Sequence, residues 1–356
     1  MSAPPNTKYM RQLDGLRAVA IGLVLVSHWI DVGLFPWGDV GVQLFFVLSG
    51  FLITGILLNC RDHGEGTTAS RFKSLRSFYI RRFLRIFPVY YLVLALCLLF
   101  GLSIIRDTFL WHALYLSNFY ITFAADRSCF PINHFWTLSV EEQFYLVWPW
   151  LALFLKDRHL KWAIVVMILI GPMSRILGET SDIPFVRLRL LPSASLDSLG
   201  YGALLAYLRW KSPETPKSSR GTNIRTLACI GAGTLLLFHF LGMHGRINHC
   251  AGNLALSFVL GWVVWRAAMG FGSPVKLILE NRSVVYLGKI SYGIYIFHNF
   301  ATYLYSKALI YYQLSPAFAE IPIRAFFLAT LTVLAAAISW HFYERPINKL
   351  KRLQPY

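Results

Sequence analysis

The chain has 356 residues, of which 56% are hydrophobic and only 14% are charged. About a quarter of the residues in an average soluble domain are charged, so this composition excludes an ordinary soluble protein and indicates a polytopic membrane protein. A formal net charge of +17 is also typical of nucleic-acid-binding proteins. Here the basic residues gather in the loops between apolar runs, so we expect no nucleic-acid partner.

Apolar runs follow one another along the chain, and most are long enough to cross a bilayer as a helix. A membrane span must satisfy its own backbone hydrogen bonds, so the predicted fold class is all-α. The sequence ends soon after the last run, and we expect one membrane domain with no appended soluble domain. About ten transmembrane helices are predicted, near residues 13–30, 39–58, 84–105, 137–155, 161–178, 190–208, 225–243, 250–268, 288–309 and 322–343.

The basic residues predict the orientation of these helices. If the N-terminus lies in the cytoplasm, 26 of the 34 Lys and Arg residues fall on the cytoplasmic side and 8 on the outer side. Such a bias is typical of membrane proteins, so we expect both termini in the cytoplasm. The apolar segment 108–124 could be an eleventh span, but it would place the later basic loops outside. We interpret it as a re-entrant or surface-lying outer segment.

The first predicted span carries two ionisable residues, Arg17 and His28. At 3.6 residues per turn, the two lie within about 20° of the same helix face and roughly 16 Å apart along the axis. Ionisable groups inside apolar spans are costly, which favours a polar cavity where they function. The alternative is that Arg17 reaches lipid phosphates and that His28 bonds a neighbouring backbone group.

Further ionisable residues mark later spans. Arg82 and Arg85 share a helix face, and paired guanidinium groups suit phosphate groups. Positive-inside anchoring explains one or two arginines but not their close spacing. Ser139 followed by Glu142 fits a capping box, which explains Glu142 structurally. Glu141 has no such explanation and is the better candidate for orienting an imidazole.

Two more ionisable residues lie inside apolar runs, Asp197 and His298. Asp197 needs a partner, and we expect an arginine. His298 could line a cavity or simply pack between helices. The five cysteines have no spacing typical of a metal site, so we expect no metal ion and no bound cofactor. Cys129 and Cys250 both fall in predicted outer loops, where they could pair.

Six stretches carry a family resemblance. They are LDGLRAVAIGLVLVSHW, GVQLFFVLSGFLIT, FYIRRFLRIFPVYYL, FWTLSVEEQFYLVWP, LGKISYGIYIFHN and FYERPI, in this order between Leu13 and Ile347. As a set they resemble the integral-membrane acyltransferase family 3, whose members move acyl groups, often acetyl, onto extracytoplasmic sugars and some secondary metabolites.

The resemblance implies roles for individual residues. The family's pattern of an Arg, ten residues and a His falls on Arg17 and His28, its Arg-x-x-Arg pattern on Arg82 and Arg85, and its acidic pair on Glu141 and Glu142. We therefore expect His28 and Glu141 to be catalytic, with His28 acting as a general base or being acylated itself. We expect Arg17, Arg82 and Arg85 to bind the donor, and Asp14, Glu142, Asp197 and His298 to have supporting roles.

The resemblance also implies the reaction. The expected function is membrane O-acyl transfer, most simply of acetyl, from cytoplasmic acyl-CoA to a hydroxyl of a carbohydrate or glycosylated acceptor. The expected location is the cytoplasmic membrane of a bacterium. The alternative is a permease without transfer chemistry, but permeases are commonly built from internal repeats with broken helices, and neither is visible. The acceptor, the acyl chain and the oligomeric state stay open.

Overall fold

A computed structural model describes residues 9–30, 33, 35–63, 67–124, 129–178, 184–211, 219–242, 248–313, 315, 318 and 320–354. Every regular element in this part of the chain is helical, which confirms the all-α fold class. Within it, six helical stretches are long and apolar enough to cross a membrane: Trp37–Asp62, Thr68–Leu99, Asp157–Gly178, Gly221–Phe240, Cys250–Met269 and Ile321–Leu353. The count of about ten spans and the cytoplasmic termini stay predictions.

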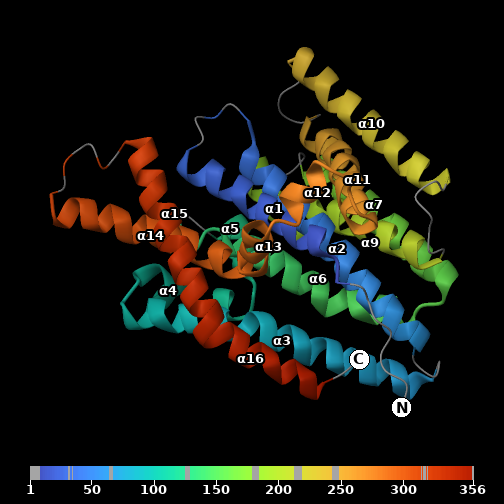
Figure 1. Ribbon diagram of the computed structural model, residues 1–356, viewed down its shortest axis with the longest axis horizontal. Coiled ribbons are helices and arrows are strands. Elements are labelled where there is room, and N and C mark those ends of the chain that lie inside the picture. The colour runs from blue at the N-terminus through green and yellow to red at the C-terminus, as the bar shows by residue number, and fades with distance from the viewer. Residues whose placement is uncertain are drawn as a thin grey trace.

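The helices form a bundle in which long, roughly aligned rods surround α1 and α2 (Figure 1). Those of the first half are α1 (Arg11–Trp29), α2 (Trp37–His63), α3 (Thr68–Leu99), α4 (Ser103–Ala113), α5 (Ser117–Phe123) and α6 (Phe135–Phe154). Those that follow are α7 (Asp157–Gly178), α8 (Phe185–Leu188), α9 (Leu196–Lys211), α10 (Ser219–Phe240), α11 (Asn253–Met269), α12 (Val275–Leu279), α13 (Arg282–Lys289), α14 (Ser291–Tyr311), α15 (Ile321–Ser339) and α16 (Arg345–Lys349). Short 3-10 or π turns join some of them: η1 (Pro192–Ser195), η2 (Asn248–Gly252), η4 (Trp340–Glu344) and η5 (Leu350–Leu353).

The end of α3 differs from the span predicted near residues 84–105. Gly101 has a φ of +68°, and the amides of Gly101 and Leu102 donate to the carbonyl groups of Leu98 and Cys97. These two bonds form the glycine cap that commonly closes a helix, so α3 ends at Leu99.

The apolar segment 108–124 is not one long helix. It is divided between α4 and α5, and the turn between them contains Tyr115 at a φ of +54°. The Tyr90 and Tyr91 hydroxyls of α3 donate to the carbonyl groups of His112 and Ala113, at 2.8 and 2.7 Å, and so hold the end of α4 against α3. No helix of spanning length forms over this segment, in line with its interpretation as something other than an eleventh span.

Helix α2 lies at the centre of the packing, because its buried residues belong to both large apolar cores. It approaches α9 so closely that only glycine fits at the crossing. A Cβ atom on Gly50 would lie 2.0 Å from the carbonyl oxygen of Leu199, and one on Gly202 would lie 2.2 Å from that of Val47. Small residues of this kind let membrane helices pack backbone to backbone.

The N-terminal end of α1 is held in a similar way. A Cβ atom on Gly288 of α13 would lie 1.8 Å from the carbonyl oxygen of Asp14, and one on Gly15 would lie 2.3 Å from that of Leu279. This contact fixes the turn of α1 that carries Asp14 and Arg17.

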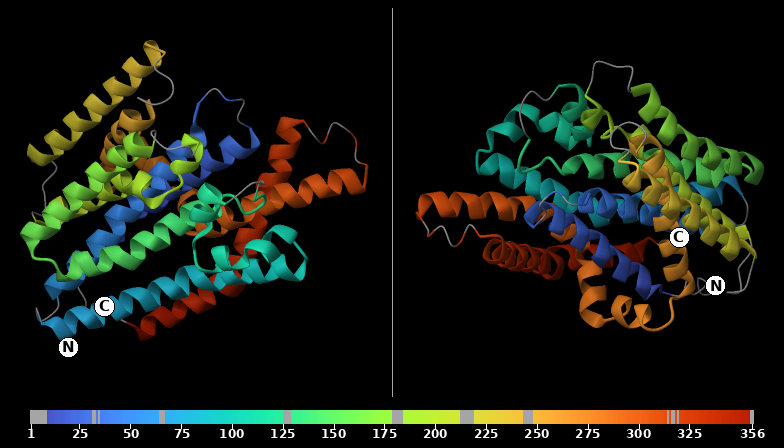
Figure 2. Two further views of the ribbon diagram at one scale, coloured as in Figure 1. Left: turned by 180° about the vertical axis from the view of Figure 1, so that it is seen from behind. Right: turned by 90° about the horizontal axis from the view of Figure 1, so that it is seen from above.

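The C-terminal helices run back along α3. Figures 1 and 2 show α16 beside α3, and the Tyr343 hydroxyl donates to the Pro88 carbonyl oxygen at 3.4 Å. The Arg81 guanidinium donates to the carbonyl oxygens of Lys351 and Gln354, at 3.0 and 3.1 Å. The segment that follows α16 is therefore tied to the basic end of α3.

Candidate active site

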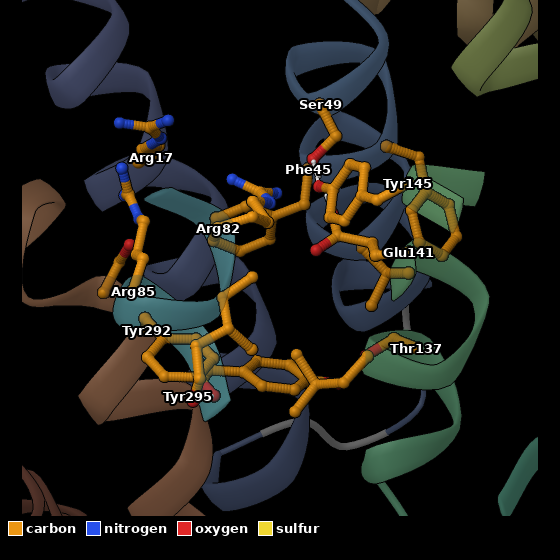
Figure 3. Close-up of a pocket in the computed structure, with 15 residues that line it drawn as sticks. Arg17, Phe45, Ser49, Arg82, Arg85, Thr137, Glu141, Tyr145, Tyr292 and Tyr295 are labelled. Atoms are coloured by element: carbon orange, nitrogen blue, oxygen red, sulfur yellow. Dashed lines mark hydrogen bonds between the residues drawn. The ribbon is translucent and has the colours of Figure 1, made fainter. Parts of the chain in front are cut away.

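The three arginines expected to bind the donor meet in one cavity, which we call the arginine cavity. Its empty space, including the part open to solvent, is about 670 Å³, and helices α1, α2, α3, α6 and α14 line it. Figure 3 shows the side chains of Arg17, Arg82 and Arg85 gathered in its upper part, with Thr137 and Tyr295 at the opposite end. The Arg82 guanidinium lies over the Tyr145 ring, 3.8 Å from its centroid. The convergence of the three guanidinium groups concentrates positive charge inside an otherwise apolar bundle.

Arg17 is oriented by Asp14, one turn earlier on α1. Its Nη1 donates to Asp14 Oδ1 at 2.7 Å. The Tyr9 hydroxyl donates to the other carboxylate oxygen, and burial together with this bond raises the pKa of Tyr9 above its usual value. Asp14 thus has a positioning contact with the predicted donor-binding Arg17.

Glu141 lies across the arginine cavity from Arg17 and Arg85 (Figure 3). Its carboxylate accepts a hydrogen bond from the Ser49 hydroxyl at 2.5 Å, and that hydroxyl in turn accepts one from Tyr145 at 2.8 Å. His28 lines a different cavity, so the structure does not bring Glu141 to the imidazole that we expected it to orient.

The predicted capping box at Ser139 and Glu142 is wrong. Helix α6 begins four residues before Ser139, at Phe135. The Ser139 hydroxyl donates to the Phe135 carbonyl oxygen at 3.2 Å and is 2.7 Å from the Ser117 hydroxyl. A serine inside a helix commonly bonds back to the preceding turn in this way, so its presence alone does not mark a helix start. Glu142 instead lies within electrostatic range of Arg82 and Glu141.

His28 opens onto a second, larger cavity, which we call the histidine cavity. Its empty space is about 1640 Å³, again including the part open to solvent, and its lining includes His134, Asn299 and Trp136. His28 Nδ1 lies 2.8 Å from the Val24 carbonyl oxygen, a contact that requires the proton on Nδ1. Nε2 of the neutral ring is therefore a proton acceptor.

Three imidazoles form a row beside this cavity, and the two at the ends, His28 and His134, line it. The ring centroids of His28 and His298 are 4.9 Å apart, and those of His298 and His134 are 4.6 Å apart. His298 is fully buried, and its Nδ1 lies 2.6 Å from the Tyr295 carbonyl oxygen. Its Nε2 has no hydrogen-bond partner among the described residues. The other end of the row is fixed by Asn299, whose amide donates to His134 Nδ1 at 2.9 Å.

His134 and Asn299 were missed as site residues, although both lie beside residues that the sequence analysis singled out. His134 directly precedes the stretch FWTLSVEEQF, and Asn299 directly follows His298. Their positions beside these residues could have indicated that they belong to a site. Only the packing of α6 against α14 shows that the two side chains meet.

The two cavities share a wall made by Val42, Thr137 and Tyr295, which line both. The Thr137 and Tyr295 hydroxyls bond to each other, and they lie 3.1 and 2.8 Å from the His134 carbonyl oxygen. Arg17 and His28 were expected to follow one polar stripe on α1. The structure instead divides this stripe, with Arg17 on one side of the wall and His28 on the other.

The expectation of an arginine partner for Asp197 is confirmed. Arg175 Nη2 lies 2.5 Å from Asp197 Oδ2, and each side chain is 1% exposed. Arg175 also donates to the carbonyl oxygens of Ala194 and Cys250. This ion pair of Arg175 and Asp197 joins α7 to α9 and lies outside both cavities defined above.

A comparison of the chain with known proteins identifies its family. The model of acyltransferase family 3, described as an acyltransferase domain, matches residues 10–341. This chain belongs to that family. No solved structure matches it.

Bacterial relatives cover almost the whole chain. The peptidoglycan O-acetyltransferase OatA of Listeria monocytogenes is 28% identical over an alignment of 373 positions, which covers 97% of this chain and 56% of that protein. The O-acetyltransferase OatA of Staphylococcus aureus is 28% identical over an alignment of 371 positions, which covers 97% of this chain and 58% of that protein. This chain therefore spans a little over half the length of these curated relatives.

Proposed function

We propose that this protein is a membrane O-acetyltransferase of the bacterial cytoplasmic membrane, which moves an acetyl group from acetyl-CoA to a carbohydrate hydroxyl. One observation carries the proposal. A cavity with three guanidinium groups and a cavity with an accessible imidazole share the wall formed by Val42, Thr137 and Tyr295. Anion-binding and proton-accepting groups thus stand on opposite sides of a thin barrier, as transfer between two compartments requires.

The arginine cavity suits the donor. Acyl-CoA is confined to the cytoplasm by its charged phosphates, and guanidinium groups bind phosphate through paired, charge-assisted hydrogen bonds. With the phosphates at Arg82 and Arg85, the pantetheine arm enters the cavity and carries the thioester toward Thr137 and Tyr295.

The histidine cavity suits the acceptor. His28 Nε2 takes the proton from the acceptor hydroxyl while the hydroxyl oxygen attacks the thioester carbonyl carbon. A new ester C–O bond forms and the thioester C–S bond breaks, so that CoA leaves as a thiolate. His28 then returns its proton to the thiolate sulfur. The products are the O-acetylated acceptor and CoA, and the wall must open for the reacting atoms to meet.

The acceptor class rests on two considerations. The named relatives are O-acetyltransferases, one of them acting on peptidoglycan. The histidine cavity is also lined by Trp136, Asn133 and the ion pair of Arg189 and Asp39. Flat aromatic and planar polar side chains suit the faces and hydroxyls of a sugar.

The test uses purified protein in lipid nanodiscs with radiolabelled acetyl-CoA and soluble chitooligosaccharides or muropeptides. We expect slow release of acetate without acceptor and labelled oligosaccharide with it. The same protein in sealed vesicles distinguishes an acetyltransferase from a permease. Uptake of acetyl-CoA or glycan with no labelled ester would indicate a permease and contradict the proposal.

A further inference from the structure

A group of basic side chains extends beyond the arginine cavity toward the C-terminal segment. Lys351 lies in η5, which the Arg81 guanidinium holds through the carbonyl oxygens of Lys351 and Gln354. Lys351 is half-buried, whereas its basic neighbours Lys349 and Arg352 are exposed. Its position is thus set by packing against α3, not by the free motion of a surface lysine.

The charges around Lys351 are unbalanced. Its ammonium group lies within electrostatic range of Arg81, Arg82 and Arg85, and of the carboxylate of Glu344. Glu344 is itself buried and accepts a hydrogen bond from the Ser339 hydroxyl at 2.9 Å. Arg82 also lies within range of Glu141 and Glu142, and Arg85 of Asp14. Lys351 itself has three guanidinium groups and one carboxylate within range, in a place that is partly withdrawn from water, where repulsion between like charges is stronger. An anion bound among them relieves this repulsion.

We propose that Lys351, together with Arg81, forms a second phosphate subsite that binds the 3′-phosphate of the CoA donor. The inference rests on the proposed function, since it takes acyl-CoA as the donor. It assigns a role to the C-terminal segment, which the sequence analysis treated only as part of the cytoplasmic positive charge.

The order of groups in CoA decides which phosphate meets which residues. The thioester and pantetheine come first, then the diphosphate, and the 3′-phosphate on the ribose lies farthest away. Arg82 and Arg85 line the arginine cavity, whereas Lys351 and Arg81 do not. With the thioester inside the cavity, the diphosphate lies at Arg82 and Arg85. Lys351 and Arg81, which do not line the cavity, then meet the more distant phosphate.

The charge count agrees with this assignment. A phosphate monoester such as the 3′-phosphate carries close to two negative charges near neutral pH, which complement the ammonium group of Lys351 and the guanidinium group of Arg81. A terminal phosphate has three free oxygens and accepts from the point-like ammonium group of lysine without a fixed geometry.

Acetyl-CoA and acetyl-3′-dephospho-CoA, which lacks only the 3′-phosphate, distinguish this role from simple anchoring. The ratio of their KM values in the transfer assay is measured for the native protein and for Lys351→Gln. We expect the native protein to favour acetyl-CoA by about 10- to 100-fold, the range expected for one charge-assisted hydrogen bond. Lys351→Gln should lower the ratio by raising the KM for acetyl-CoA alone, and Lys351→Arg should retain most of the preference.

Lys349→Gln is the matched control. It removes the same charge from an exposed position two residues before Lys351. It should keep the native ratio. An unchanged ratio in Lys351→Gln, an equal rise of both KM values, or no preference in the native protein would each overturn the 3′-phosphate subsite while leaving the acetyltransferase proposal intact. A native protein that uses neither donor would contradict the proposed function and, with it, this inference.

Discussion

His28 presents Nε2 to the histidine cavity because its other ring nitrogen bonds the Val24 carbonyl oxygen. A general base at this place contributes about 100- to 10,000-fold to the rate. His28→Ala and His28→Gln should therefore both lose transfer by that factor, while acetyl-CoA binding, measured by isothermal titration calorimetry, stays native. Glutamine keeps hydrogen bonding but cannot take up a proton near neutral pH.

The control for the His28 variants is His239→Gln. His239 is an exposed residue on the distant helix α10, so this variant should keep native turnover. His298→Ala should be milder than either His28 variant, because His298 contacts the His28 ring but does not line the cavity. Near-native turnover by His28→Gln would remove His28 as the base.

The guanidinium groups of Arg82 and Arg85 should determine donor affinity. Loss of a charge-assisted phosphate contact costs about 1.5 to 3 kcal/mol, so each change to Ala should weaken acetyl-CoA binding by roughly 10- to 100-fold. Arg76→Ala is the matched control, since Arg76 is an exposed arginine on the same helix. Unchanged affinity in the double variant would mean that the two arginines only anchor α3 at the membrane surface.

At the scale of the elements, the wall between the cavities depends on the packing of α6 against α14. The Tyr295 hydroxyl bonds Thr137 and the His134 carbonyl oxygen. Tyr295→Phe removes these bonds but keeps the ring, so the wall should loosen and acetyl-CoA hydrolysis without acceptor should rise several-fold relative to transfer.

Tyr292→Phe separates this effect from a general loss of packing. Tyr292 is on the same helix and lines the arginine cavity, but its hydroxyl bonds Ile86 and it is not part of the wall. Its ratio of hydrolysis to transfer should stay native. Equal ratios in the two variants would show that the Tyr295 hydroxyl does not control passage.

The close crossing of α2 and α9 should contribute to the thermal stability of the protein. Gly50→Ala places a Cβ atom 2.0 Å from the Leu199 carbonyl oxygen, so the helices must separate. Overpacking typically costs about 1 to 3 kcal/mol, which should lower the midpoint of thermal unfolding in detergent. Gly55→Ala on the same helix meets nothing within 4 Å and should be neutral or stabilising. Equal midpoints for both variants would contradict backbone contact at Gly50.

At the scale of the whole molecule, the uneven distribution of basic residues predicts the topology. Reporter tags at the N-terminus, within the stretch 211–225 and after residue 356 should all report the cytoplasm, because 26 of the 34 Lys and Arg residues then lie there. Residues 212–218 of this stretch lie outside the described part of the chain, and α10 begins at Ser219. A signal from the outer side at the middle tag would rule out the arrangement of ten spans.

The helical class and the Arg82 and Arg85 pair were predictable because both depend on nearby residues. Apolar runs form helices wherever water is absent, and residues three apart share a helix face. The partner of Asp197 was predictable only by type, since a buried carboxylate needs a cation. That the cation is Arg175 depends on how α7 packs against α9.

The sequence by itself determined the helical membrane class and the family, because these follow from composition and from short patterns along the chain. Only the tertiary structure decided how the predicted site residues are divided between two cavities. Thr137 and Tyr295 are 158 residues apart, yet their hydroxyls meet and separate Arg17 from His28. Lys351 likewise joins Arg82 and Arg85 only because the C-terminal segment folds back on α3. Contacts between distant segments depend on the packing of whole helices, which no local pattern encodes.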